Sequence, residues 1–243
     1  MTVSRVLNEQ PGVSDETRQR ILDTITTLGY VASPAARTLR GTSKILGLVV
    51  PNLTSFYMGE VISGIARAAE QLDYGLMLYM QGETHHTSRT TYYASLLSNG
   101  LADGAVMIVP YDYEVLVREF KDHDLAYVLI DHHDNSNDDP AITATNRKGI
   151  LEAMRHLLAL GHRRIGFITG RMALGCSQER LEGYRVALAE VGLLYDAQYI
   201  CEGDFEQPTG FAQAQRLLRL HPRPTAIVAS NDVMAFGAME AIK

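Results

Sequence analysis

The sequence of 243 residues lacks the apolar runs of 18 or more residues that membrane-spanning helices require. Its first residues are polar and show none of the features of a secretory signal. It has only two cysteines, Cys176 and Cys201, and they lie apart in the chain. We therefore expect no disulfide framework, and we interpret both as buried or inert thiols. The cytoplasm is the expected location.

Signatures of catalysis are lacking as well. The two histidine pairs, at 85–86 and 132–133, consist of adjacent residues, which point in different directions and lack the spacing of metal ligands. The chain contains no glycine-rich phosphate loop and no nucleophile elbow. The acidic residues within 131–139 are interpreted as a solvated loop. The sequence thus predicts a protein that is not an enzyme and that uses neither a metal nor a cofactor.

The net charge is −6, which on its own argues against a protein that binds nucleic acid. The charge is unevenly distributed, however. Residues 1–44 contain six basic and four acidic residues, whereas the remainder contains 16 basic and 24 acidic residues. A basic head on an acidic body can approach phosphates while the body stays soluble. An excess of two positive charges can also arise by chance, so the charge alone does not decide the function.

The N-terminal segment reads as a small helical head. The residues Thr2–Asn8 predict a first helix, and Gln10-Pro11-Gly12 interrupts it. A second helix is predicted over Val13–Gly29, with Ser14 as its N-cap and a glycine at its end. Pro34 can start a short helix that reaches about Arg40. Such a head has too little apolar surface for a catalytic domain, but its size and helical content suit a DNA-binding domain.

The remainder of the chain alternates apolar strands with amphipathic helices, a pattern that is typical of parallel sheets covered by helices. The strands are predicted at 45–50, 76–80, 105–109, 127–130, 142–144, 165–169, 199–202 and 226–229. The helices are predicted at 57–72, 88–98, 115–121, 149–160, 178–191 and 209–220, with a final helix from Asp232. The pattern restarts near Ile165, which predicts two similar lobes with a cleft between them. Ligands of open α/β sheets bind beyond the carboxyl ends of the strands, so this cleft is the expected small-molecule site.

Several segments, in this order and at these spacings, resemble the signature blocks of the lactose-repressor/galactose-repressor (LacI/GalR) family of bacterial transcription regulators. The resemblance extends from Thr2 to Lys243. The blocks are Thr2–Asn8, Ala36–Leu39, Gly47–Pro51, Phe56–Tyr57, Leu160–Ile165, Glu179–Tyr184, Gly203–Phe205 and Pro224–Asp232. The resemblance implies a two-lobed effector domain that is similar to periplasmic binding proteins. A helix-turn-helix head and a hinge helix would precede this domain.

For DNA, the resemblance implies that Thr2–Asn8 matches the recognition helix, which enters the major groove. Within it, Arg5 can bond guanine with two hydrogen bonds, and Ser4 can bond phosphate. Taken without the family, a terminal arginine could equally be a solvated residue. The expected DNA contacts of this helix are Thr2, Ser4, Arg5 and Asn8.

The block Ala36–Leu39 matches the family's hinge helix, which implies DNA contacts for Ala36, Arg37 and Leu39. Two copies of Leu39 side by side would make a pair of apolar wedges that opens a base step in the minor groove. A segment this short is not a stable helix alone, so it would need its partner chain. The alternative is that Leu39 belongs to a linker and packs on the body.

For the effector, the resemblance implies that Asp131, Arg180 and Asn231, with Asp232 following, contact a ligand in the cleft. Together they supply donors and acceptors suited to the hydroxyl groups of a sugar. Asp131 could instead be a loop residue, and Arg180 the partner of a helix ion pair. The family often has an acid at the position of Thr145, so a role for that loop is not assigned.

Three aromatic residues match positions that stack on the ligand or enclose it: Phe56, Tyr57 and Phe205. Aromatic faces suit the apolar face of a sugar or a purine. Phe205 could also be an ordinary core residue. The resemblance implies a homodimer, or a dimer of dimers, whose affinity for operator DNA depends on the bound effector.

The domains are therefore predicted at 1–32 for the helix-turn-helix head, 33–44 for the hinge helix and linker, 45–141 for the first lobe and 142–243 for the crossover and second lobe. The family's head has a helix before the recognition helix, and further strands follow the position of Lys243. We therefore expect a piece of a longer product, with a partial head and an incomplete second lobe; a shortened chain is the alternative. The predicted function is that of a regulator, with repression as the expected sign. The alternative is a soluble sugar-binding module that does not bind DNA.

Overall fold

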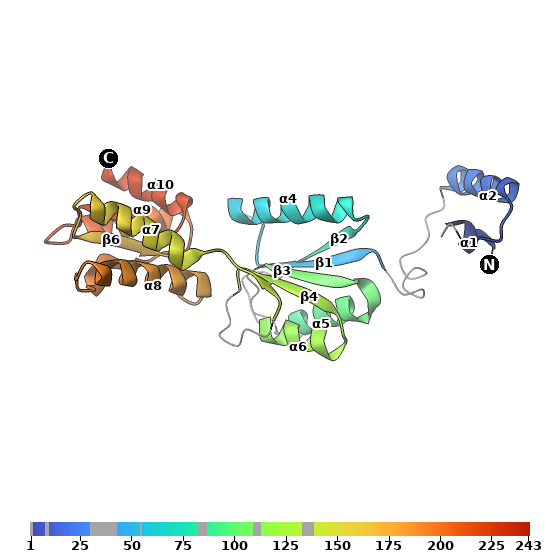
Figure 1. Cartoon of the computed structure of the whole chain (residues 1–243), viewed down its shortest axis with the longest axis horizontal. Helices are drawn as coiled ribbons and strands as arrows, with labels where there is room; N and C mark the ends of the chain where they lie inside the picture. Colours follow the sequence, from blue (N-terminus) through green and yellow to red (C-terminus); the bar gives the residue numbers. More distant parts are fainter. Residues whose placement is uncertain are drawn as a thin grey trace.

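Two parallel sheets, each covered by helices, form the larger part of the molecule (Figure 1). The structure, a computed structural model, describes residues 2–7, 10–29, 43–53, 55–81, 87–108, 113–132 and 139–243. The predicted α/β class and the parallel strands are confirmed. Among the described residues, no helix combines the length and the apolar character needed to cross a bilayer.

The first sheet has the strand order β2-β1-β3-β4-β5. Its strands are β1 (Ile45–Val50), β2 (Gly75–Met80), β3 (Gly104–Ile108), β4 (Ala126–Ile130) and β5 (Ala141–Ile142). Helix α4 (Phe56–Gln71) covers one face, and α5 (Thr87–Leu96) and α6 (Tyr113–Asp122) cover the other (Figure 1). Successive residues of a strand point to opposite faces, so Leu48 and Val50 pack toward α4 while Val49 packs in the core beneath α5 and α6.

The second sheet has the order β7-β6-β8. It consists of β6 (Ile165–Thr169), β7 (Ile200–Glu202) and β8 (Ala226–Ala229), with α7 (Asn146–Ala159), α8 (Gly175–Glu190), α9 (Gln207–Leu218) and α10 (Asp232–Ile242) around it. The central strand β6 again faces two cores. Phe167 packs with α7 and α8, and Ile168 packs with α9 and α10. The chain passes from the first sheet to the second between β5 and α7.

Some predicted boundaries were wrong. Helices α7 and α8 each begin three residues before the predicted start, because their first turns carry polar or small residues that extend the helix without extending the apolar pattern. Strand β5 ends at Ile142, and the N–H of Ala144 donates to the side chain of Asp131. The helix predicted to reach Ser98 ends at Leu96 and continues as a wide turn over Leu97–Leu101.

The head contains α1 (Thr2–Leu7) and α2 (Asp15–Leu28). The predicted capping of α2 is confirmed, since the Ser14 hydroxyl accepts from the N–H of Thr17 and Gly29 ends the helix with a φ of 58°. None of the side chains of α2 is buried, and even the apolar side chain of Leu28 is largely exposed to solvent. The short helix predicted over Pro34–Arg40 lies outside the described residues.

Candidate functional site

The carboxyl ends of the strands bring together residues that are far apart in the sequence. Asp131 directly follows β4, and α4 begins soon after β1, where the hydroxyl of Ser55 caps it by accepting from the N–H of Met58 at 3.1 Å. In the second sheet, Gly170 directly follows β6. Parallel strands end at one edge of their sheet, so side chains that follow these strands share that edge.

Tyr57 and Asp131 are bonded to one another across this edge of the first sheet. The Tyr57 hydroxyl donates a short hydrogen bond to Asp131 Oδ2, and Asp131 Oδ1 accepts from the N–H of Ala144 at 3.1 Å. Asp131 has a φ of 53°, in the left-handed region that few non-glycine residues adopt. Burial and the hydrogen bond to Asp131 raise the pKa of Tyr57 well above its usual value, so the hydroxyl remains a donor at neutral pH.

Arg180 lies on α8 and is oriented by Asn146 at the start of α7. Its Nε donates to Asn146 Oδ1 at 3.0 Å, and Asn146 Nδ2 donates to Glu179 Oε2 at the same distance. The guanidinium carbon also lies 5.8 Å from the centre of the Phe205 ring, a distance that permits a cation–π interaction. Asn146 is buried, so this network fixes the direction in which the guanidinium points.

Groups from the two lobes lie close enough to influence one another electrostatically. The positive charge of Arg180 acts to lower the pKa of Tyr57, against the larger effects of burial and Asp131. The pKa of Cys176 is raised by burial, and Arg180 and Asp131 act on it in opposite directions. We name Tyr57 and Asp131 of the first lobe and Cys176 and Arg180 of the second the interlobe cluster, because these charges act on the pKa values of Tyr57 and Cys176 across the two lobes.

The sequence did not indicate Cys176 or Asn146 as site residues. Both cysteines are buried, as the sequence predicted, and burial raises the pKa of the Cys176 thiol. Cys176 precedes Arg180 by four residues and so lies on the same face of α8. This helical spacing is the signal that could have identified it. Asn146 had no comparable signal, because its partners Glu179 and Arg180 are more than thirty residues away in the chain.

Phe205 and Asn231 form a second group in the second lobe. Phe205 has a φ of 75°, and its ring lies so close to Gly170 that a Cβ there would be 1.9 Å from Cζ. The Asn231 side chain donates to the carbonyl of Phe205 at 2.9 Å and accepts from the N–H of Met234 at 3.0 Å. Asn231 thus caps α10 and holds the Phe205 backbone, and Asp232 lies in the first turn of that helix.

Phe56, the remaining predicted effector contact, is largely exposed at the start of α4. Among the described residues, no group of three histidine, cysteine or acidic side chains is arranged to hold a metal ion. The roles of the predicted effector contacts stay predictions. The structure brings Tyr57 into contact with Asp131 in the first lobe and places Arg180 beside Phe205 in the second.

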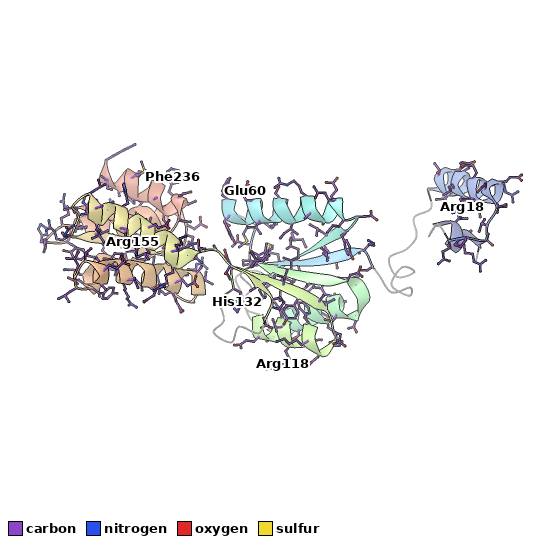
Figure 2. The ribbon with its side chains drawn as sticks, viewed as in Figure 1. Arg18, Glu60, Arg118, His132, Arg155 and Phe236 are labelled. Carbon is purple, nitrogen blue, oxygen red and sulfur yellow. The ribbon has the colours of Figure 1, made fainter. Side chains whose placement is uncertain are left out.

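In the head, the predicted DNA contacts Thr2 and Arg5 are exposed on α1, and Ser4 belongs to the same helix. Asn8, Ala36, Arg37 and Leu39 lie outside the described residues. The turn between the two helices is held by Arg18 of α2, which is labelled in Figure 2. Its guanidinium donates to the carbonyl of Val6 at 3.4 Å and to that of Gln10 at 2.9 Å.

Comparison with protein families gives two matches that together account for most of the chain. Residues 1–33 match the family described as bacterial regulatory proteins, lacI family. Residues 43–243 match the family described as periplasmic binding proteins and sugar binding domain of LacI family.

Curated relatives extend over the same length. The HTH-type transcriptional repressor PurR of Mannheimia succiniciproducens is 32% identical over 245 residues, which cover 99% of this chain and 72% of the relative. Catabolite control protein A of Priestia megaterium is 30% identical, with 98% and 72% covered. The chain thus spans roughly three quarters of the length of these relatives.

Solved structures show the same fold. A lac repressor dimer bound to operator and the anti-inducer ONPF has a TM-score of 0.86 and 26% identity, over 99% of this chain and 72% of that one. A complex of the transcriptional regulator CelR with cellobiose has a TM-score of 0.73 and 25% identity, over 98% and 72%.

Proposed function

From the premise that the chain belongs to the LacI family of bacterial regulatory proteins, we propose that it represses transcription by binding an operator under the control of a small molecule held between its lobes. DNA-binding transcription regulation is the function of the family, so the alternative of a sugar-binding module without DNA binding is set aside. Because the family consists of regulators, we propose no catalytic role for the cleft. Because its proposed partner is operator DNA, we place the protein in the cytoplasm with the bacterial chromosome.

The single observation that supports the effector site is the interlobe cluster. Asp131 presents carboxylate oxygens from the first lobe, with the Tyr57 hydroxyl bonded to one of them, whereas Arg180 presents a guanidinium donor from the second. Phe205 stacks beside Arg180 and offers an aromatic face. A ligand with several hydroxyl groups and one apolar face, such as a sugar, satisfies groups of both kinds at once. The similar CelR structure is a complex with cellobiose, and the similar lac repressor structure holds the anti-inducer ONPF.

Among the other predicted effector contacts, Asn231 and Asp232 serve the site indirectly. Asn231 bonds the backbone at Phe205 and at Met234, so it sets the position of the Phe205 ring. Phe56 is exposed beside Tyr57, where it can cover a ligand that enters the cleft.

On the DNA side, we propose that α1 reads the major groove through Thr2, Ser4, Arg5 and Asn8. Thr2 and Arg5 are exposed, as base and phosphate contacts require. The proposed minor-groove contacts remain Ala36, Arg37 and Leu39. The proposed boundaries between 1–32, 33–44 and 45–141 are supported by the family matches, of which one ends at 33 and the other begins at 43. The proposed division between 45–141 and 142–243 is supported by the passage of the chain from the first sheet to the second between β5 and α7.

A homodimer is the proposed assembly, and a second copy of the chain is the proposed occupant of an exposed apolar surface. Helix α10 exposes Phe236, Met239 and Ile242, each more than half accessible to solvent. Phe236 lies on the same side of the molecule as Glu60 of α4 (Figure 2). Exposed apolar side chains grouped on one helix indicate a protein interface. The lac repressor structure with the same fold is a dimer on its operator.

The proposed mechanism is a shift between two arrangements of the lobes. An effector that contacts Asp131 and Arg180 together favours the arrangement that suits it, and operator DNA favours the one that brings the two heads to the spacing of its half-sites. A coupling of about 1–3 kcal/mol changes operator affinity about 5- to 150-fold.

The test begins with DNA. The full-length gene product is used to select duplexes from fragments of its own genome, and a panel of monosaccharides, disaccharides and purine bases is then added to the gel-shift reaction. We expect an enriched duplex and at least one compound that changes its affinity about fivefold or more. A protein that enriches no duplex would refute the proposed function.

A further inference from the structure

The chain enters the first sheet through Ser43 and Lys44, and one carboxylate holds both residues. Asp103 Oδ1 accepts from the N–H of Ser43 at 2.5 Å and from its hydroxyl at 2.8 Å. Asp103 Oδ2 accepts from the N–H of Lys44 at 2.9 Å. We name Ser43, Lys44 and Asp103 the entry anchor. It uses both oxygens of one side chain to bind a segment sixty residues earlier in the sequence.

Lys44 is held from other sides as well. Its carbonyl accepts from the N–H of Gly75 at 2.8 Å, and its ammonium lies 4.6 Å from the centre of the Tyr74 ring. Its φ is 56°, in the left-handed region, so the backbone turns sharply at this residue. A lysine keeps this conformation only where its surroundings determine it. The direction in which the chain leaves the sheet is therefore fixed by contacts rather than by the intrinsic preference of the residue.

Asp103 is itself fixed by the sheet. Its N–H donates to the carbonyl of Ile45 at 2.8 Å, directly before β3 begins. Ser43 is 4% exposed, so its N–H would have little access to water if Asp103 were removed. Partial burial alone would raise the pKa of Asp103, but the three hydrogen bonds outweigh it, and the pKa lies below its usual value.

The entry anchor lies at the opposite end of β1 from the proposed effector site. Strand β1 runs from Ile45, next to the anchor, to Val50, after which the chain leads to Tyr57. Six residues of strand span about 20 Å. Asp103 therefore does not touch the interlobe cluster, and it is free of any role in binding the effector directly.

We propose that Asp103 is a positioning residue for operator recognition: it fixes the point and the direction at which residues 1–42 join the first lobe. This inference rests on the proposed function of those residues as the DNA-binding head of a dimer. Two heads recognise an operator only when they match the fixed spacing of its half-sites. Releasing Ser43 and Lys44 adds backbone freedom that specific binding must remove again. Binding to DNA of arbitrary sequence has no such requirement, because it depends mainly on phosphate contacts.

The experiment compares Asp103→Asn with wild type in the full-length protein. The probes are the duplex that wild type selects from a random-sequence library and a duplex of scrambled sequence, both titrated by fluorescence anisotropy. We expect the variant to bind the selected duplex about 5- to 30-fold more weakly. This loss corresponds to the entropy of ordering the backbone of one or two residues again on binding. Affinity for the scrambled duplex should change by less than about twofold. Asp122→Asn, an exposed acid at the end of α6, is the matched control and should bind both duplexes as wild type does.

Hydrogen exchange of the peptide that contains residues 43–50 provides the second measurement, with faster exchange expected in Asp103→Asn. Ser43→Ala is the milder variant, since it removes only the hydroxyl bonds to Asp103 and to the N–H of Ile45, and it should show a smaller loss in the same direction. Two results would overturn the inference. One is an equal loss of affinity for both duplexes in Asp103→Asn. The other is wild-type affinity for the selected duplex although residues 43–50 of Asp103→Asn exchange faster. Failure of wild type to select any duplex would refute the proposed function instead.

Discussion

At the scale of single residues, the candidate site depends on side chains that orient one another before any ligand arrives. Asn146 directs Arg180, Tyr57 bonds Asp131, and Asn231 holds the backbone of Phe205. Side chains fixed in this way lose little conformational freedom on binding, so more of the interaction energy appears as affinity. Several polar groups of the site are thereby assigned to positioning roles.

Arg180→Ala should abolish the response to the effector and leave DNA binding intact. Removing a hydrogen-bonded charge from a partly buried site costs about 2–5 kcal/mol of binding free energy, or roughly 30-fold to several thousand-fold in affinity. Arg185→Ala is the matched control, since Arg185 lies on the same helix but contacts the Tyr195 ring instead. Gel shifts with and without the active compound measure the response. A response that survives in Arg180→Ala would remove this residue from the site.

Gly170→Ala should destabilise the second lobe, because the new methyl group would lie 1.9 Å from Phe205 Cζ. Overpacking of this kind costs about 1–3 kcal/mol in the free energy of unfolding. Gly64→Ala in α4 is the control, since no atom lies within 4 Å of its added Cβ, and it should be neutral or stabilising by up to about 1 kcal/mol. Thermal denaturation followed by circular dichroism compares the two variants. Equal unfolding midpoints for Gly170→Ala and Gly64→Ala would show that the Phe205 ring moves aside without loss of stability.

At the scale of secondary structure elements, the contacts at the starts of strands and helices position the neighbouring segments of the chain. Strand β1 starts where Asp103 binds Ser43 and Lys44, and helix α10 starts where Asn231 caps it. Both contacts bind backbone N–H groups that would otherwise lack partners at the start of the element. The first contact fixes residues 43 and 44, and Asn231 also bonds the backbone of Phe205, a proposed effector contact.

The entry anchor should weaken in acid. The folded pKa of Asp103 lies below that of the unfolded chain, so this carboxylate contributes stability that is fully present above its ordinary pKa of 3.8 and is lost as the pH falls through the lower, folded value. Wild type should therefore lose more unfolding free energy than Asp103→Asn does between pH 5 and the acid limit of folding. Urea denaturation at several pH values tests this, and parallel pH profiles for the two proteins would contradict it.

At the scale of the whole molecule, two lobes and a small head share one chain, and the proposed regulation requires a second copy. Helix α10 exposes the apolar residues Phe236, Met239 and Ile242. In the proposed dimer they are covered, and the two heads are brought to one operator.

Phe236→Asp should convert the dimer to a monomer, since a charge buried in an apolar interface lacks compensation and costs at least about 2 kcal/mol. Leu194→Asp is the control, because Leu194 is also highly exposed but lies in the loop between α8 and β7. Sedimentation equilibrium of the full-length protein gives the assembly state. If Phe236→Asp remains a dimer with unchanged affinity, α10 does not form the interface.

Leu39→Ala should weaken binding to the selected operator more than binding to scrambled DNA. The proposed wedge acts only where two hinges meet at a base step that can open, so its loss removes specific contacts and spares phosphate contacts. Leu39 lies outside the described residues, and the prediction comes from the family's hinge block. Anisotropy titrations against both duplexes measure the ratio. Equal losses on both would reject the wedge role.

The sequence alone determined the family and the α/β class, and it supplied the candidate residues of the proposed site. Strands β1, β6 and β8 match their predicted residues, because each is a short, mainly apolar stretch whose ends are marked by polar residues, glycine or proline. Arg180 and Phe205 were identified by their place in signature blocks, and Asp131 by its match to the family's acidic residue after the fourth strand. The family comparisons confirm the family that those blocks indicated. Such features are local, so the order of residues along the chain suffices to reveal them.

Only the tertiary structure decided which of these residues act on one another. The bond between Tyr57 and Asp131 joins residues 74 apart in the sequence, and the contact of Arg180 with Asn146 joins residues 34 apart. The anchor of Ser43 on Asp103 is of the same kind. Side-chain partners of this type depend on how strands stack in the sheet and on where their ends meet. No periodicity along the chain encodes that arrangement, because it arises from packing between elements that the sequence separates.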